Sequence, residues 1–111
     1  MNFGNKIMIN HNGLIHFFDY KDVLFLKSDN NYTTIYLNNG KEYLMIKSLA
    51  KLERELNDSL FIRVNQSYLI NKIYVVNIDK KKKTILLNND HIIHFTINLK
   101  RLIELITNPT H

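Results

Sequence analysis

Residues 61–71 place a cation and three adjacent polar side chains inside otherwise β-forming sequence. Arg63 is a forked donor, and Asn65 and Gln66 each offer a donor and an acceptor side by side. These groups suit DNA, because paired amide groups match the major-groove edge of adenine and cations match phosphate. Arg63 and Ser67 would then hold phosphate, whereas Asn65 and Gln66 would read bases. The alternative is a local turn whose Asn and Ser side chains cap nearby backbone groups.

Composition restricts the classes of protein that the chain can belong to. Its 111 residues suit one domain with a modest core, and an apolar content of 45% is typical of globular proteins. The 15 Lys and Arg against 10 Asp and Glu give a formal charge of +5, which favours anionic partners such as nucleic acid. The absence of Cys excludes disulfides and thiolate metal sites. No apolar run approaches the ~20 residues of a membrane span, and the first residues lack a signal peptide, so we expect a cytoplasmic protein without a membrane partner.

The residue types that carry out catalysis or bind metals are present but not grouped. His91 and His94 lie three apart on a predicted strand, so their side chains point to opposite faces. No Ser has a recognisable His and acid around it, and the Gly content is too low for a phosphate-cradling loop. We therefore expect no enzyme activity, no metal and no cofactor.

Turn-forming dipeptides divide the chain into short strands. Asn12-Gly13 and Asn39-Gly40 favour tight type I′ hairpins, because both central positions need positive φ, and Asn89-Asp90 is a weaker version of the same pattern. Four consecutive lysines at residues 80–83 predict a hairpin tip. The predicted strands are 6–10, 14–18, 32–37, 41–46, 74–79, 84–87 and 91–95.

Two segments have the periodicity of amphipathic helices. The first covers residues 48–56 with Ser48 as its N-cap, and the second covers residues 97–106 with Thr96 as its N-cap. Free amides at the second N-terminus would attract phosphate, and Lys100 and Arg101 in its first turn are further candidate phosphate contacts. The sequence thus predicts a mainly β fold with two short helices.

The segment 61–71 also resembles the signature of the LytTR (LytR/AlgR-type) DNA-binding domain of bacterial transcription regulators. That signature reads Phe-x-Arg-hydrophobic-His-x-Ser-Tyr/Phe-hydrophobic-hydrophobic-Asn. The matching positions are Arg63, Ser67, Tyr68 and Asn71. Asn65 replaces the usual His, so a contact there would be neutral. Residues 23–32 resemble the first strand and loop of the family, and residues 48–53 resemble its central helix.

The resemblance extends over residues 6–106 of a single domain, 1–111. It implies elongated antiparallel β-sheets whose loops enter successive major grooves, and sequence-specific binding of double-stranded DNA for transcriptional regulation, as in response regulator output domains. By the same analogy Asn30 and Asn31 are base readers, with Tyr32 stacking on the sugar-phosphate or packing inward. Where the family often has a base-reading Arg, this chain has Asn98 as the substitute. The complete set of expected DNA contacts is Asn30, Asn31, Tyr32, Arg63, Asn65, Gln66, Ser67, Asn98, Lys100 and Arg101.

Two other functions remain open from the sequence. One is a non-enzymatic protein-interaction or ligand-sensing β-domain, and the other is an RNA reader with Tyr32 and Tyr36 as stacking platforms. Family members usually carry an N-terminal receiver or sensor domain that controls assembly on paired DNA sites. The resemblance therefore implies a second copy and an upstream receiver or sensor domain as further partners, in a longer chain or beside a stand-alone regulator.

Overall fold

A five-stranded antiparallel sheet forms the centre of the fold, with strand order β5-β4-β3-β7-β6. The structure is a computed structural model that describes residues 6–108. The strands of this sheet are β3 (Val23–Asp29), β4 (Tyr32–Leu37), β5 (Glu42–Met45), β6 (Phe61–Arg63) and β7 (Tyr68–Asn71).

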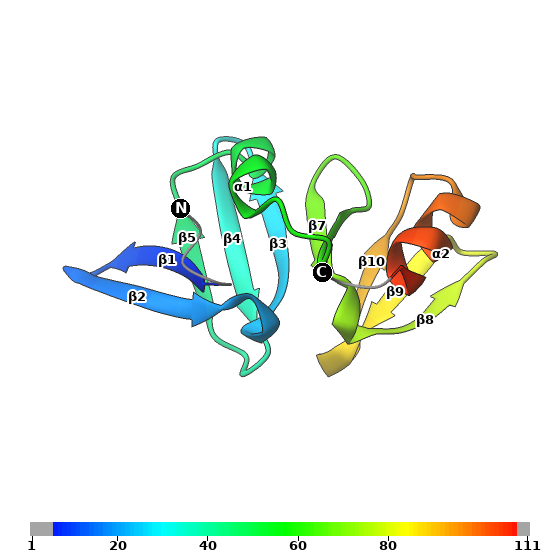
Figure 1. Cartoon of the computed structure of the whole chain (residues 1–111), viewed down its shortest axis with the longest axis horizontal. Coiled ribbons are helices and arrows are strands. Elements are labelled where there is room, and N and C mark those ends of the chain that lie inside the picture. Colours follow the sequence, from blue (N-terminus) through cyan, green and yellow to red (C-terminus); the bar gives the residue numbers. More distant parts are fainter. Residues whose placement is uncertain (1–5, 109–111) are drawn as a thin grey trace.

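Smaller elements extend the central sheet in both directions along one axis (Figure 1). One end carries the hairpin of β1 and β2, and the other carries a three-stranded sheet of order β10-β9-β8 together with α2. The bounds are β1 (Lys6–His11), β2 (Leu14–Asp19), β8 (Val75–Asp79), β9 (Thr84–Leu87), β10 (His91–His94), α1 (Leu49–Leu56) and α2 (Leu99–Thr107), with 3-10 turns at Tyr20–Asp22, Lys72–Tyr74 and Asn88–Asp90. The body measures 45 × 28 × 24 Å, so the predicted elongated, mainly β fold is confirmed.

Strand β3 is buried on both faces, which explains its continuous apolar run. Val23 and Leu26 belong to the core beneath α1 and β1, whereas Leu24 and Phe25 belong to the core shared with β8–β10 and α2. A bulge between Val23 and Phe25 places two consecutive side chains in the second core. The central sheet therefore contributes side chains to both cores.

Helix α1 forms as its sequence predicts. The Ser48 hydroxyl accepts from the amide of Lys51 at 3.1 Å, and Leu49, Leu52 and Leu56 are buried along one stripe. This apolar stripe fixes the rotation of the helix, so its polar residues point in defined directions.

Helix α2 begins later than predicted, because its N-cap is Asn98 and not Thr96. The Asn98 side-chain oxygen accepts from the amide of Arg101 at 3.2 Å. Thr96 is still outside the helix, where its backbone amide donates to the carbonyl of Val64 at 2.9 Å. The other end of α2 is held by the buried Lys72, whose ammonium donates to the carbonyl of Asn108 at 2.7 Å.

The two Asn-Gly turns differ in structure. Asn12 and Gly13 both have positive φ, of 52° and 77°, and close the predicted two-residue hairpin between β1 and β2. The turn at Asn39-Gly40 has a three-residue loop instead, in which Gly40 has φ of 90° and Leu37 and Lys41 face each other. A type I turn followed by a left-handed residue can also join two antiparallel strands, so the predicted type I′ turn is wrong there.

Among residues 6–108, no helix is long and apolar enough to cross a membrane.

We expect Asn71→Ala to destabilise the fold by about 2–4 kcal/mol, since it leaves buried backbone groups without partners. Asn71 is fully buried, donates to the carbonyls of Tyr20 (3.1 Å) and Val23 (2.9 Å), and accepts from the amide of Ile73 (3.2 Å). Urea denaturation measures the loss, with Asn77→Ala at an exposed strand position as the control. A variant as stable as the control would contradict this role.

Candidate nucleic-acid interface

Three loops lie along one edge of the elongated body, the upper edge in Figure 1. They join β3 to β4 (residues 29–32), β6 to β7 (residues 64–67) and β10 to α2 (residues 95–98). We refer to these three segments as the loop edge. The first two loops lie side by side because β3 and β7 pair antiparallel, which places the end of β3 beside the start of β7.

Backbone hydrogen bonds connect the three loops to one another. The amide of Ser28, the residue of β3 that directly precedes the first loop, donates to the carbonyl of Ser67 at 2.7 Å and so holds that loop beside the second. The amide of Thr96 donates to the carbonyl of Val64 at 2.9 Å, which joins the second loop to the third. The loop edge is therefore a continuous surface and not three independent loops.

The side chain of Asn65 adds a second connection and closes its own turn. Its oxygen accepts from the amides of Ser67 (2.7 Å) and Tyr68 (2.9 Å), and its nitrogen donates to the carbonyl of His94 at 2.6 Å. This is the turn-capping arrangement that the sequence allowed as the alternative to base reading. A two-bonded grip on adenine would require Asn65 to give up these contacts.

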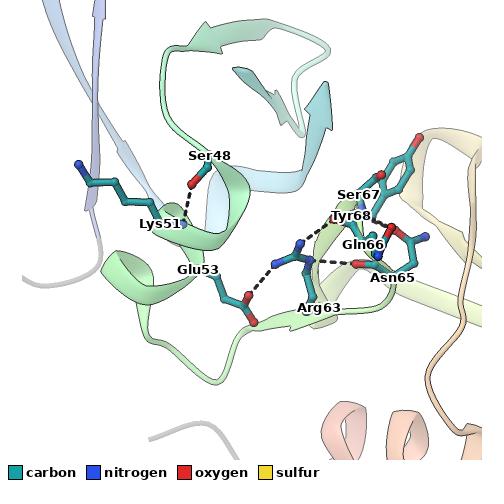
Figure 2. A network of polar contacts seen from close by, with 8 residues as sticks. All are labelled: Ser48, Lys51, Glu53, Arg63, Asn65, Gln66, Ser67 and Tyr68. Atoms are coloured by element: carbon teal, nitrogen blue, oxygen red, sulfur yellow. Dashed lines mark hydrogen bonds and ion pairs between the residues drawn. The ribbon is translucent and has the colours of Figure 1, made fainter. Parts of the chain in front are cut away.

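Arg63 lies against the second loop and is bonded within the protein (Figure 2). Its Nε donates to the carbonyl of Asn65 at 2.9 Å, and its Nη2 donates to the carbonyl of Gln66 at 2.6 Å. Its Nη1 forms an ion pair with Glu53 of α1 at 2.8 Å, with the Arg63 side chain 29% exposed. A phosphate would have to compete with Glu53 for this guanidinium.

Other polar side chains of the loop edge are exposed to solvent. Asn30 and Asn31 form a two-residue turn between β3 and β4, in which Asn30 has φ of 57°. Within the described residues, the side chains of Asn30, Asn31 and Gln66 make no hydrogen bond, and all three are exposed. Tyr32 is 45% exposed, and Ser67 is half-buried. These side chains are available to a ligand.

The third loop presents a capped helix start together with cations. Asn98 uses its side-chain oxygen as the N-cap of α2, which leaves its amino group to donate outward. Lys100 and Arg101 are exposed on the first turn, and Arg101 also approaches Glu104 at 3.7 Å.

The four lysines at residues 80–83 form the predicted hairpin tip, between β8 and β9. The Asp79 carboxylate accepts from the amides of the second and third lysines at 3.0 and 2.9 Å, which holds the turn. The carbonyl of the fourth lysine accepts from the amide of Phe95 at 3.0 Å. This positive turn therefore lies beside the third loop.

Four residues of this surface, Lys27, Tyr68, His94 and Thr96, are outside the set of DNA contacts expected from the sequence. A shallow depression between the second and third loops is lined by Asn65, Gln66, Ser67, Tyr68, His94 and Thr96. From the sequence, His94 is considered only as a metal ligand, a role that is rejected, and Thr96 only as a helix cap. The exposed Lys27 places its ammonium 5.9 Å from the centre of the Tyr68 ring. Strand alternation could have shown that Lys27 is exposed. Its neighbour Tyr68 belongs to another strand 41 positions later, so the pair could not be seen in the local sequence.

Of the two tyrosines considered for RNA stacking, Tyr36 is half-buried and packs against the second core. Its ring stacks on Phe25 with centroids 4.4 Å apart, and burial raises the pKa of its hydroxyl above the ordinary value. An exposed pair of stacking platforms at Tyr32 and Tyr36 is therefore absent from the part of the chain that the structure describes.

Sequence comparison finds related regulators. The chain is 32% identical over 80 residues to "Heme-containing CO-sensing transcriptional regulator RcoM 2" of Paraburkholderia xenovorans, covering 72% of this chain and 30% of that protein. It is 28% identical over 79 residues to "Transcriptional regulatory protein LytR" of Staphylococcus aureus, covering 71% of this chain and 32% of that protein. The chain thus spans about a third of the length of these curated relatives.

Structure comparison agrees on the fold. The LytTr DNA-binding domain of a putative methyl-accepting/DNA response regulator from Bacillus cereus superposes with a TM-score of 0.74 at 14% identity, covering 92% of this chain and 95% of that one. The sequence model of the LytTr DNA-binding domain matches residues 13–107, which is most of the chain. The protein therefore belongs to the LytTr DNA-binding domain family.

Proposed function

We propose that this protein binds double-stranded DNA sequence-specifically to regulate transcription, and that the loop edge is its DNA-binding surface. Family membership supports DNA binding as the general activity. The observation that carries the specific proposal is the hydrogen bonding of three loops into one continuous edge. Exposed amides on this edge can pair with base edges, and exposed cations next to them can pair with phosphates.

The exposed side chains divide into two chemical groups. Gln66, Asn31 and Asn30 are the proposed base readers, because their amides are exposed and make no hydrogen bond within the described residues. The amino group of Asn98 is a further donor toward a base. The proposed backbone contacts are Tyr32, Ser67, Lys100 and Arg101. Asn65 and Arg63 contribute by holding the second loop, through the contacts described above.

The shape of the body supports reading of successive major grooves. Its long axis measures 45 Å, whereas one turn of B-DNA is about 34–36 Å. Loops spread along such an axis can meet successive grooves on one side of a duplex. Four lysines at the β8–β9 turn lie toward one end of this axis, where they add favourable electrostatic energy near phosphate (Figure 1).

The proposal also includes the wider regulatory context. The matched relatives are about three times longer than the segment they share with this chain, and one of them is described as heme-containing and CO-sensing. We propose that a sensor or receiver domain controls DNA binding, that a second copy occupies a paired site, and that the protein acts in the cytoplasm, where its DNA is.

Selection of bound duplexes from a random pool tests the proposal and supplies the operator. We expect enrichment of one motif by the wild-type protein. Gln66→Ala should then relax the preference at one position by a factor that corresponds to about 1–3 kcal/mol, with the salt dependence almost unchanged. The matched control is Asn88→Ala, an exposed amide at the start of the β9–β10 connection, on the edge opposite the loop edge. If Gln66→Ala selected the wild-type motif unaltered, its role as a base reader would be wrong.

The dependence of affinity on salt tests the phosphate contacts. Neutralising both cations of the α2 start, as in Lys100→Gln with Arg101→Gln, should make the log–log salt slope shallower by about 2, since each contact contributes about 0.9. The control is Lys21→Gln with Lys41→Gln, which removes the same charge from exposed positions away from the loop edge. Equal slopes for the two double variants would contradict the assignment.

A wild-type protein without duplex affinity at low salt would favour the interaction-domain alternative, and a preference for single strands would favour RNA binding.

A further inference from the structure

We propose that Glu53 and Arg63 form a positioning pair through which helix α1 sets the conformation of the second loop. The inference rests on the proposed function, because it concerns how that loop is prepared for DNA. It assigns a role to α1, a helix that contributes no residue to the loop edge itself.

The guanidinium of Arg63 binds two consecutive carbonyls of the loop. It donates to Asn65 at 2.9 Å through Nε and to Gln66 at 2.6 Å through Nη2. Two neighbouring carbonyl dipoles that point toward one centre repel each other, so a cation between them stabilises this backbone shape. With its carbonyl turned toward Arg63, Gln66 keeps its side chain exposed to solvent.

Glu53 binds the third nitrogen of the guanidinium. Its carboxylate accepts from Nη1 at 2.8 Å, so three of the five donors of Arg63 have partners. The buried neighbour Leu52 anchors α1 at this point, and Glu53 therefore approaches Arg63 from a fixed direction (Figure 2). Lys at position 63 could supply the charge, but it lacks the planar fork that binds three acceptors at once.

The two possible roles of Arg63 predict opposite effects of Glu53. If Arg63 contacted phosphate, Glu53 would compete with DNA and repel it, so removing its charge would strengthen binding to every duplex. If Arg63 positions the loop, removing that charge loosens the loop and weakens recognition of the operator. A loss of preference for the operator therefore indicates positioning, whereas tighter binding to all duplexes with the preference intact indicates a phosphate contact.

The experiment compares Glu53→Gln with Glu55→Gln, two residues further along the same helix. Glu55 pairs with Lys47 at 3.0 Å, so its substitution removes the same charge without touching the loop. Binding to the selected operator and to a scrambled duplex is measured by fluorescence anisotropy across a range of salt concentrations. We expect Glu53→Gln to reduce the operator preference about tenfold, the discrimination of one base contact, with an unchanged salt slope. Glu55→Gln should keep the wild-type preference.

Arg63→Lys separates charge from geometry. It retains the cation, so a phosphate-contact role predicts near wild-type preference, whereas positioning predicts the same loss as Glu53→Gln. Tighter binding of Glu53→Gln to all duplexes with the preference intact would overturn the inference, as would wild-type preference in Arg63→Lys.

Backbone amide NMR of the free protein tests the pair without DNA. In Glu53→Gln we expect shift changes at residues 65–67 and none at residues 38–41 of the β4–β5 loop, with thermal melting confirming that the variant is folded. Unchanged shifts at 65–67 would overturn the inference even if the wild type binds DNA. If the wild type binds no duplex, the proposed function fails, and this measurement still decides whether the pair shapes the loop.

Discussion

The candidate interface depends on the hydrogen bonds of the Asn65 side-chain amide. Its oxygen closes the turn into β7, and its nitrogen reaches the carbonyl of His94 at the end of β10. Because β7 belongs to the central sheet and β10 to the smaller sheet, one side chain connects the two sheets at the loop edge. Together with the backbone bonds of Ser28 and Thr96, it orders the loops before any ligand arrives. Such preorganisation reduces the conformational entropy lost on binding.

Polar residues of the loop edge thus serve two purposes. Asn65 and Arg63 turn their groups inward and fix the backbone, while Gln66 and Asn31 present their amides to solvent. The scaffold beneath them depends on buried apolar residues in two cores, and a similar fold occurs at only 14% identity in the Bacillus cereus domain. Exposed loop residues can vary on such a scaffold without loss of the fold.

Local patterns predicted the elements that depend on local chemistry. The Asn12-Gly13 hairpin and the helix after Ser48 form as expected, because their signals lie within a few residues. The sequence allowed Asn65 as a turn cap, but the contacts of Arg63 with Glu53 and of Asn65 with His94 could not be predicted, since these partners are 10 and 29 positions away. The N-cap of α2 is Asn98 and not the predicted Thr96 for a similar reason. The distant carbonyl of Val64 holds Thr96 outside the helix.

We propose that the loop edge, and no other face, binds DNA. Amide hydrogen exchange of the protein with and without a selected duplex tests this most directly, because it reports on every backbone segment at once. We expect the added protection to be concentrated at residues 28–32, 64–68 and 94–101. Protection centred on the β1–β2 hairpin or on the opposite edge, at residues 38–41 and 88–90, would contradict it.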